Sequence, residues 1–384
     1  MNRPRIAHVL NSIGLGGVPE AAYHLMRALP PGIYDNRVYV LKRAAGEEDA
    51  REGRAARFAD VGVAVAFPAR DDAKLGGVGE LAAWLLQERI DVLHTHSYKP
   101  NLYGRLAGLL CRHAGLKMIA HYHNQYDNKW EKDGALIYDQ LLAHSTDALI
   151  ACSQSVAEHI AARIGVAPQR VHVVLNGVEA ERFAGGDAVQ ARRELGVPLD
   201  VPVLGCVGRI SEQKGQEEFI RAAALVHQAF PDALFLVIGS ADDEALLARL
   251  RGLGDELGLG AVLRFTGHLS DMPMVYAALD ILVAPSRWEG FGLMLAEAMA
   301  AAKAIVATRA GAIPEVVIEN ETALLVPPRD APALATAMLT LLRDPARARA
   351  MGLRGVQRAR DFSWERSGQR LNLLYQKVLG TGRS

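Results

Sequence analysis

Hydrophobic and polar positions alternate along the chain in two patterns. Short runs of mostly apolar residues, typical of buried strands, are separated by longer stretches in which apolar residues recur at intervals of three and four. Strands that alternate with helices in this way favour parallel sheets built from βαβ units. The pattern therefore predicts an α/β protein.

The predicted elements form two successive sets. Strands of the first half are expected at Ile6–Asn11, Asn36–Leu41, Val63–Phe67, Val92–His96, Lys117–His121, Ala148–Ala151 and Val171–Leu175, with helices at Pro19–Ala28, Gly79–Arg89, Tyr98–Ala114 and Ser155–Ile164. Strands of the second half are expected at Val203–Val207, Leu234–Ile238, Leu263–Thr266, Ile281–Ala284, Ala304–Thr308 and Ala323–Val326, with helices at Gly215–Ala229, Asp242–Leu257, Met272–Ala278, Gly292–Ala301, Ile313–Ile318 and Ala331–Arg343. A last helix follows Ser363 and runs to about Leu379. Because the sets share no long internal repeat, they predict two doubly wound domains.

Turn-forming residues mark the boundary between the two sets. Asn176-Gly177 is a turn signal, and Gly185-Gly186, Pro198 and Pro202 continue the loop chemistry after it. We expect the chain to pass from the first domain to the second within this stretch.

Charge and composition exclude several classes of protein. The chain has 384 residues, with 43 Lys and Arg against 43 Asp and Glu, so a broad basic surface for nucleic acid is not expected. Cys111, Cys152 and Cys206 are odd in number and far apart, which favours a reducing cytoplasm over a disulfide framework.

Membrane contact is expected to be peripheral at most. No stretch approaches the ~20 consecutive apolar residues that a membrane-spanning helix needs. Basic and acidic residues are interleaved between positions 42 and 57, which predicts weak or no binding to anionic lipid. A second set of cations, Lys99, Arg105 and Arg112, shares one predicted helix with leucines that we expect to face the core.

The first strand is followed by a glycine-rich loop. Gly14, Gly16 and Gly17 allow backbone to approach a ligand closely, and Pro19 suits the first turn of a helix whose N-terminus favours anions. A phosphate contact and a purely structural turn are equally consistent with this loop. The spacing differs from the dinucleotide fingerprint G-x-G-x-x-G, which argues against a nicotinamide enzyme.

A second glycine-bounded loop carries two cations. Arg209 and Lys214 lie between Gly208 and Gly215, directly after the first strand of the second domain. Ligands of doubly wound sheets bind at the carboxyl ends of strands, where an Arg fork and a Lys point charge suit a diphosphate. Taken alone, the loop is more typical of a solvated surface than of a diphosphate site.

Two carboxylates flank a third loop, which runs from Pro285 into a helix near Gly292. Glu289 lies in the turn and Glu297 lies eight residues later on the helix. A carboxylate before a helix N-terminus is electrostatically favourable, so Glu289 could act only as a cap. Fixed acceptors around an open Gly-Phe-Gly turn are also suited to binding sugar and ribose hydroxyls.

Together these segments resemble the retaining glycosyltransferases of family 4, which have the GT-B fold. The resemblance rests on Glu289-x7-Glu297, on the Gly-Arg-Ile-x3-Lys-Gly loop and on the early Gly-Gly pair, and it extends to Ala151–Ser155, Asn176–Val178, Gly311–Glu315 and Ser363-Trp364. One departure is Ala301–Ala304, where the family usually has a glycine and then a proline.

The resemblance implies a domain plan. Two Rossmann-like domains would face a central cleft, and a C-terminal helix would cross back to the first domain. Residues 1–180 would form the acceptor-side domain, with the helix of 364–384 packed on it, and residues 181–363 would bind the nucleotide sugar.

The resemblance also implies roles for individual residues. Arg209 and Lys214 would hold the diphosphate, Glu297 the ribose, and Glu289 the transferred sugar. Gly16 and Gly17 would contact the donor phosphate, and His268-Leu269 would contact the base through backbone groups. The implied donor-binding residues also include Gly290, Phe291, Gly292 and Leu293, and the implied catalytic residues are His123, Glu289, Arg209 and Lys214.

Two histidine pairs leave an alternative open. His94 and His96 fall on one face of a strand, as do His121 and His123. They could bind zinc in a hydrolase, although no carboxylate with ligand spacing flanks them, or they could be interior residues satisfied by backbone. In the family that the chain resembles, the residue matching His123 orients the donor sugar, and His96, Tyr98 and Asn124 are the acceptor-side candidates.

The expected function is the transfer of a hexosyl unit from a nucleotide diphosphate sugar to a hydroxyl acceptor with retained anomeric configuration. A UDP-sugar is favoured over a GDP-sugar, no cofactor is expected, and the absence of an Asp-x-Asp sequence argues against a metal at the diphosphate. The resemblance points to a saccharide or lipid-linked saccharide acceptor in capsule, exopolysaccharide or lipopolysaccharide assembly, in the cytoplasm. Alternatives are a sugar-nucleotide epimerase on the same fold and the zinc hydrolase.

Overall fold

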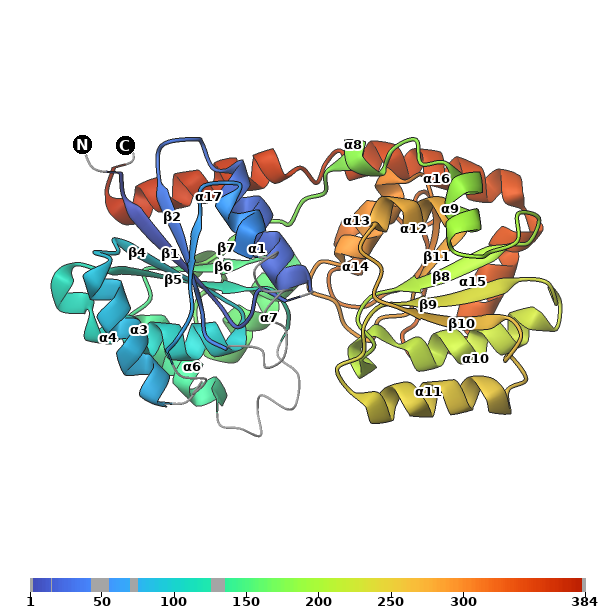
Figure 1. Ribbon diagram of the computed structural model, residues 1–384, viewed down its shortest axis with the longest axis horizontal. Helices are drawn as coiled ribbons and strands as arrows, with labels where there is room; N and C mark the ends of the chain where they lie inside the picture. The colour runs from blue at the N-terminus through green and yellow to red at the C-terminus, as the bar shows by residue number, and fades with distance from the viewer. Residues whose placement is uncertain (1–2, 15, 43–54, 70–74, 126–134, 382–384) are drawn as a thin grey trace. The chain divides into compact units, whose positions relative to one another are not determined.

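The chain divides into two compact units. The structure, a computed structural model, describes residues 3–14, 16–42, 55–69, 75–125 and 135–381. One unit contains residues 1–176 and 364–384, and the other contains residues 177–363 (Figure 1). Most of the interleaved charged stretch at 42–57 lies outside the described residues, so the expectation of weak lipid binding stays a prediction.

A seven-stranded parallel sheet forms the centre of the first unit, in the order β3-β2-β1-β4-β5-β6-β7 (Figure 1). Its strands are β1 (Arg5–Leu10), β2 (Asp35–Val40), β3 (Ala64–Ala66), β4 (Val92–His96), β5 (Lys117–Tyr122), β6 (Ala148–Ala151) and β7 (Val171–Val173). Its helices are α1 (Gly17–Ala28), α3 (Leu75–Gln87), α4 (Arg105–Leu110), α6 (Ala135–His144), α7 (Gln154–Ile164) and α17 (Trp364–Leu379).

Alternating residues of the central strands bury both faces of this sheet. Ala7 and Val9 of β1 belong to the core beneath α3 and α4, whereas Leu10 belongs to the core beneath α1. The strand order reverses direction between β1 and β4, and the carboxyl ends of these two strands form the topological switch point where α/β sheets bind ligands.

The helix predicted at 98–114 is present but is not one regular α-helix. A π-helical turn at Pro100–Gly104 precedes α4, and a 3-10 turn at Arg112–Ala114 follows it. The backbone presses against the sheet here, because a Cβ at Gly108 would lie 2.5 Å from the Met118 sulfur. This packing buries Arg105 and pairs it with Asp139, so Arg105 is not part of a surface cluster.

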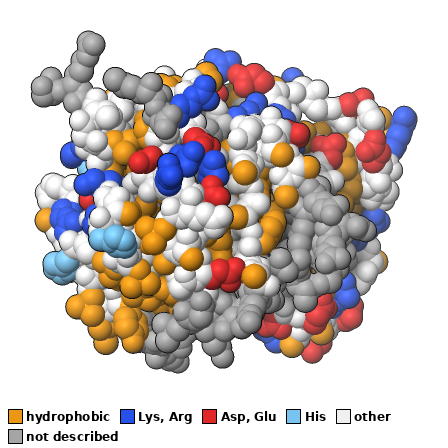
Figure 2. All heavy atoms as spheres, turned by 60° about the vertical axis from the view of Figure 1, so that its left-hand side comes forward, with side chains coloured by type: hydrophobic (Ala, Val, Ile, Leu, Met, Phe, Trp, Pro, Cys, Tyr) orange, Lys and Arg blue, Asp and Glu red, His pale blue; other side chains and the backbone are white. Residues whose placement is uncertain are grey.

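Unit 1 also exposes apolar side chains, among them two leucines of α4 that we expected to face the core. Leu109 and Leu110 of α4 are 39% and 57% exposed, and Ile137, Tyr138 and Leu141 of α6 are also exposed. In the space-filling view, the left-hand side of Figure 1 is turned toward the viewer, and hydrophobic side chains are gathered on the surface (Figure 2). None of the helices in the described ranges has the length and hydropathy needed to cross a membrane.

The last helix, α17, packs on unit 1 against α1. The Trp364 ring stacks on His24 with centroids 5.0 Å apart, and Ser367 donates a hydrogen bond to the Leu175 carbonyl. Gly368 permits the close approach, since a Cβ there would lie 2.2 Å from the Ala28 carbonyl oxygen. The C-terminal end of the chain thus packs on the first domain through a close contact between α17 and α1 at Gly368.

A six-stranded parallel sheet forms the centre of the second unit, in the order β10-β9-β8-β11-β12-β13. Its strands are β8 (Val203–Val207), β9 (Leu234–Ile238), β10 (Leu263–Gly267), β11 (Ile281–Ala284), β12 (Ala304–Thr308) and β13 (Leu324–Val326). Its helices are α8 (Ala180–Phe183), α9 (Ala188–Glu194), α10 (Gln216–His227), α11 (Glu244–Glu256), α12 (Met272–Ala278), α13 (Leu293–Ala300), α14 (Ile313–Val316), α15 (Ala331–Arg343) and α16 (Pro345–Ala359).

This sheet has its switch point between β8 and β11. The loops that leave these strands at their carboxyl ends carry Arg209 and Lys214 after β8, and Glu289 after β11. The structure therefore confirms the predicted α/β class with two doubly wound domains. The first unit ends at Asn176 in its main segment, four residues before the boundary expected at 180.

Candidate functional site

The two loops at the switch point of unit 2 are bound to each other. The Arg287 amide donates to the Gln213 carbonyl at 2.7 Å, and the Gln213 side chain donates to the Trp288 carbonyl at 3.1 Å. Gly215 has φ +68°, and a Cβ there would lie 2.1 Å from the Pro285 carbonyl oxygen. Glycine at this position lets the loops touch through their backbones.

Lys214 and Glu289 meet where these loops touch. The Lys214 ammonium lies 2.5 Å from Glu289 Oε2, and their side chains are only 18% and 9% exposed. The Ser286 hydroxyl also reaches Glu289 Oε2 at 3.4 Å. A charge pair sheltered from water interacts more strongly than a surface pair, so this pair is a rigid, polar feature of the site.

The backbone around Gly311 packs directly against the backbone of Glu289. The Ala312 amide donates to the Glu289 carbonyl at 3.0 Å, and Gly311 has φ +53°. A Cβ at Gly311 would lie 2.3 Å from the Glu289 carbonyl oxygen. The Gly-x2-Pro-Glu segment, which we noted only as part of a resemblance, therefore shapes the turn that carries Glu289.

Glu297 lies on α13 and is held by a residue that the sequence analysis missed. The Tyr276 hydroxyl of α12 donates to Glu297 Oε2 at 2.7 Å. Burial, reinforced by the Glu297 carboxylate, raises the pKa of Tyr276 well above its usual value, so the phenol remains a hydrogen-bond donor. The only sequence signal was an aromatic residue in a helix that otherwise looked like core.

The rest of the expected donor segment surrounds the start of α13. Gly290, Phe291 and Gly292 are buried, Leu293 is half-buried, and Gly292 has φ +85° at the N-cap of the helix. After β10, His268 is exposed and Leu269 is half-buried.

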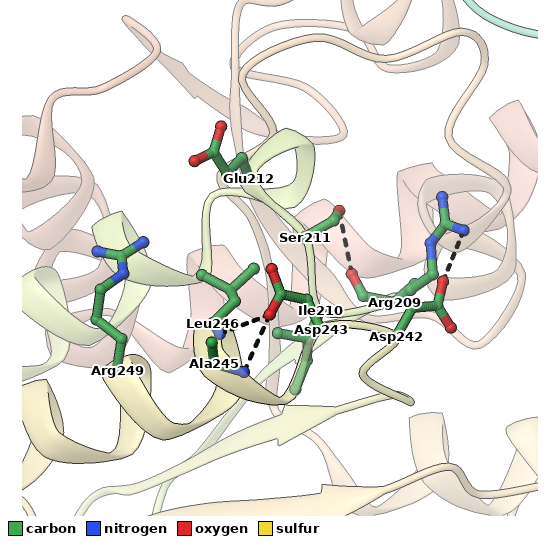
Figure 3. Close-up of a pocket in the computed structure, with 9 residues that line it drawn as sticks. All are labelled: Arg209, Ile210, Ser211, Glu212, Asp242, Asp243, Ala245, Leu246 and Arg249. Carbon is green, nitrogen blue, oxygen red and sulfur yellow. Dashed lines mark hydrogen bonds and ion pairs between the residues drawn. The ribbon is translucent and has the colours of Figure 1, made fainter. Parts of the chain in front are cut away.

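Arg209 lines an open pocket, and neither Lys214 nor Glu289 is among the residues that line it (Figure 3). Its guanidinium lies 3.1 Å from Asp242, and both side chains are mostly exposed. Asp243 caps α11 on the other side of the pocket by accepting from the Ala245 and Leu246 amides. Because an exposed ion pair contributes little stability, Arg209 can exchange Asp242 for another anion at low cost.

In unit 1, Gly16 and Gly17 are exposed at the N-terminus of α1, next to the carboxyl end of β1. Gly16 has φ +149°, which side chains rarely adopt, so the turn requires a glycine. Leu15 lies outside the described residues.

The predicted histidine pairs come together, and a fifth histidine joins them. β4 and β5 are neighbours with His96 opposite His121, and β1 places His8 beside β4 opposite His94. His96 Nε2 lies 3.0 Å from His8 Nδ1, and His96 Nδ1 lies 3.1 Å from His123 Nε2. His8 is a lone histidine within an apolar strand, and nothing in the pattern marked it.

These imidazoles are neutral near pH 7. Burial lowers the pKa of His8 to about 4 and that of His123 to about 3. Burial and neighbouring imidazoles lower the pKa of His94, His96 and His121 well below the usual value.

The expectation that interior histidines are satisfied by backbone is wrong for this cluster. The rings bond one another, and His94 Nδ1 bonds the Tyr375 hydroxyl at 2.7 Å. Both ring nitrogens of His121 are buried and have no hydrogen-bond partner among the described residues. Of the acceptor-side candidates, His96 has no exposed surface, whereas Tyr98 and Asn124 are half-buried at the ends of β4 and β5.

Two family models match the chain, one in each unit. The model described as Glycosyltransferase Family 4 matches residues 15–182, and the model described as Glycosyl transferases group 1 matches residues 201–344.

Curated proteins similar to this chain are also glycosyltransferases. A D-inositol 3-phosphate glycosyltransferase of Corynebacterium glutamicum is 31% identical over 78% of this chain and 76% of its own length. A D-inositol 3-phosphate glycosyltransferase 1 of Catenulispora acidiphila is 32% identical over 80% of this chain and 77% of its own length.

A solved structure supports the fold. HepE of Anabaena, crystallised with UDP and glucose, superposes with a TM-score of 0.84 over 97% of this chain and 99% of its own, at 21% identity. The GT-B fold predicted from the resemblance is thereby confirmed.

Proposed function

Because the chain belongs to glycosyltransferase family 4, we propose that it transfers a hexosyl unit from a nucleotide diphosphate sugar to an acceptor hydroxyl with retention of the anomeric configuration. UDP is the favoured nucleotide. The observation that carries this assignment is the sheltered Lys214–Glu289 pair at the switch point of unit 2, where a cation for phosphate and an acceptor for sugar hydroxyls lie 2.5 Å apart.

The donor would be held mainly by unit 2. Lys214 and Arg209 bind the diphosphate, Glu297 accepts from the ribose while Tyr276 orients it, and Glu289 accepts from the transferred sugar. Backbone groups provide the remaining contacts, to the base at His268-Leu269, to the donor at Gly290–Leu293, and to the phosphate at Gly16 and Gly17.

The reaction follows from where charge develops. The bond between the sugar C1 and the phosphate oxygen breaks, and its electron pair passes to the departing diphosphate, which Lys214, Arg209 and helix N-termini stabilise. The acceptor oxygen attacks from the same face and gives its proton to the leaving phosphate, while His123 orients the sugar. A sugar trapped covalently on any side chain would contradict this mechanism.

Cations of the chain replace a metal at the diphosphate in this proposal. Lys214 supplies a fixed positive charge, and Arg209 is held only by an exposed carboxylate that an incoming phosphate can displace. Full activity in the presence of a chelator is the expected result.

The acceptor is proposed to be a saccharide or lipid-linked saccharide of the cell envelope. Transfer takes place on the cytoplasmic side of the membrane, and Tyr98 and Asn124 contact the acceptor. The names of the curated relatives favour a second candidate, inositol 3-phosphate. Both acceptors present the hydroxyl that the transfer requires.

A matrix of donors and acceptors tests the assignment. UDP- and GDP-linked glucose, galactose, mannose and N-acetylglucosamine are each combined with inositol 3-phosphate or with lipid-linked saccharides, and release of nucleoside diphosphate is measured. We expect a UDP-sugar to be used, and NMR of the product to show the donor's anomeric configuration. An inverted product, or an altered donor sugar without acceptor, would overturn the proposal.

A further inference from the structure

We propose that His96, His121 and His123 of unit 1 form a binding site for one divalent transition-metal ion of the zinc class. The three side chains each offer a ring nitrogen, and these nitrogens lie within 4.8 Å of one another. His96 Nδ1 and His123 Nε2 are 3.1 Å apart, close to the ~3.3 Å between two nitrogens that bind one tetrahedral ion at ~2.0 Å.

His121 is the strongest indication of a missing ligand. It is fully buried, and neither ring nitrogen has a hydrogen-bond partner in the described part of the chain. Leaving a buried polar group unsatisfied destabilises the folded state, and native structures rarely keep such groups without a reason. An ion bound by His121 would satisfy one of these nitrogens and would replace the contact between His96 Nδ1 and His123 Nε2.

A neighbouring histidine outside the proposed site holds one of its ligands in place. His8 Nδ1 contacts His96 Nε2 at 3.0 Å, which orients the His96 ring so that its other nitrogen faces His123. Such outer contacts fix the rings of metal-binding histidines. His8, His94 and His96 form a second triad, but the Tyr375 hydroxyl already engages His94 and lies 3.5 Å from His8.

The chemistry of the ligands selects the ion. Three neutral imidazoles suit zinc, cobalt, nickel or copper, whereas magnesium and calcium prefer oxygen ligands. Three histidines leave a fourth position for water, as in known zinc sites. His123 is only partly buried, at the carboxyl end of β5, which gives an ion a route to the two fully buried rings.

A consequence for transfer rests on the role proposed for His123. An ion bound to the His123 ring would compete with the donor sugar for the same imidazole, so zinc would inhibit transfer and a chelator would restore it. The metal site itself does not depend on that role.

Cobalt titration of the chelator-treated full-length protein tests the site. We expect one equivalent of Co²⁺ to bind and to give the visible absorption of a tetrahedral ion. The variants His121→Gln and His123→Gln should bind Co²⁺ at least tenfold more weakly. His94→Gln, in the second triad, and His144→Gln, at the surface, should bind it as the parent does, and magnesium should not compete.

Several outcomes would overturn the site. These are no stoichiometric binding to the parent protein, unchanged binding in both His121→Gln and His123→Gln, or loss in His94→Gln alone. The half-buried His123 position provides the test if His121→Gln does not fold. If cobalt binds as expected while zinc leaves transfer unaffected, the donor-sugar role of His123 fails and the metal site remains.

Discussion

At the scale of single residues, the candidate site of unit 2 depends on partners that hold each charged group in a fixed direction. Glu289 bonds Lys214 and Ser286, and Glu297 accepts from Tyr276. A carboxylate fixed in this way presents its remaining lone pairs in one direction, which is what recognition of a sugar or ribose hydroxyl requires.

Substituting Glu289 separates a role in catalysis from a role in stability. We expect Glu289→Gln to lower kcat about 10–100-fold, because a charge-assisted hydrogen bond to the sugar is lost, while affinity for nucleoside diphosphate changes little. The matched control is Glu218→Gln, which breaks the neighbouring buried pair between Glu218 and Arg287. The control should have a lower melting temperature and an unchanged kcat. A Glu289→Gln enzyme with normal kcat would refute the assignment.

Removing one hydroxyl tests the proposed ribose site. Tyr276→Phe deletes the hydrogen bond that orients Glu297, so we expect the affinity for donor and for free nucleoside diphosphate to fall together. The expected loss is about 0.5–1.5 kcal/mol, or roughly 2–10-fold, as measured by calorimetric titration. Glu297→Ala should cost more than Tyr276→Phe, and equal affinity in Tyr276→Phe and parent protein would show that Tyr276 does not orient the ribose partner.

At the scale of elements, glycines decide how closely the loops and helices approach. Gly215 and Gly311 both have positive φ and both face a backbone carbonyl oxygen at a distance that excludes a Cβ. The carboxyl ends of β8 and β11 therefore converge through backbone contacts, and Lys214 and Glu289 meet as a consequence.

A pair of glycine substitutions tests this geometry. Gly311→Ala would place a Cβ 2.3 Å from the Glu289 carbonyl oxygen, so we expect a loss of about 1–3 kcal/mol in stability and a lower kcat. Gly258 also has a positive φ, +73°, but a Cβ there would meet no atom within 4 Å, so Gly258→Ala should lose only about 1–2 kcal/mol without a change in kcat. Equal kcat in the two variants would mean that Gly311 does not position Glu289.

At the scale of the whole molecule, the buried histidines link the stability of unit 1 to pH. Folding lowers the pKa of His8 from 6.5 to about 4, so between these values the unfolded chain binds a proton that the folded chain does not. The contribution of His8 to the free energy of unfolding is therefore fully present above pH 6.5, and it is lost as the pH falls toward 4.

Thermal unfolding of the chelator-treated protein measures this effect. We expect the melting temperature to fall steadily from pH 7 to pH 5, since each group of this kind contributes up to about 1.4 kcal/mol per pH unit. The variant His8→Asn should show a shallower fall over the same range. A melting temperature that is flat with pH, or an unchanged slope in His8→Asn, would show that the cluster is not kept neutral by folding.

The sequence by itself determined the fold class, the order of the strands along the chain and the loops that carry the chemistry. Strand and helix periods are local properties, and glycines and charged residues at strand ends are visible without a structure. Arg209, Lys214, Glu289 and Glu297 became candidate site residues in this way.

Only the tertiary structure decided which of these residues meet. Lys214 and Glu289 are 75 positions apart and touch because β8 and β11 are neighbours, whereas Arg209, from the same loop as Lys214, turns to Asp242. Tyr276 and His8 looked like core residues, and the helix predicted at 98–114 is irregular where Gly104 and Gly108 pack against side chains of the sheet. Periodicity records which face of an element is apolar, but strand order and close backbone packing determine what that face touches.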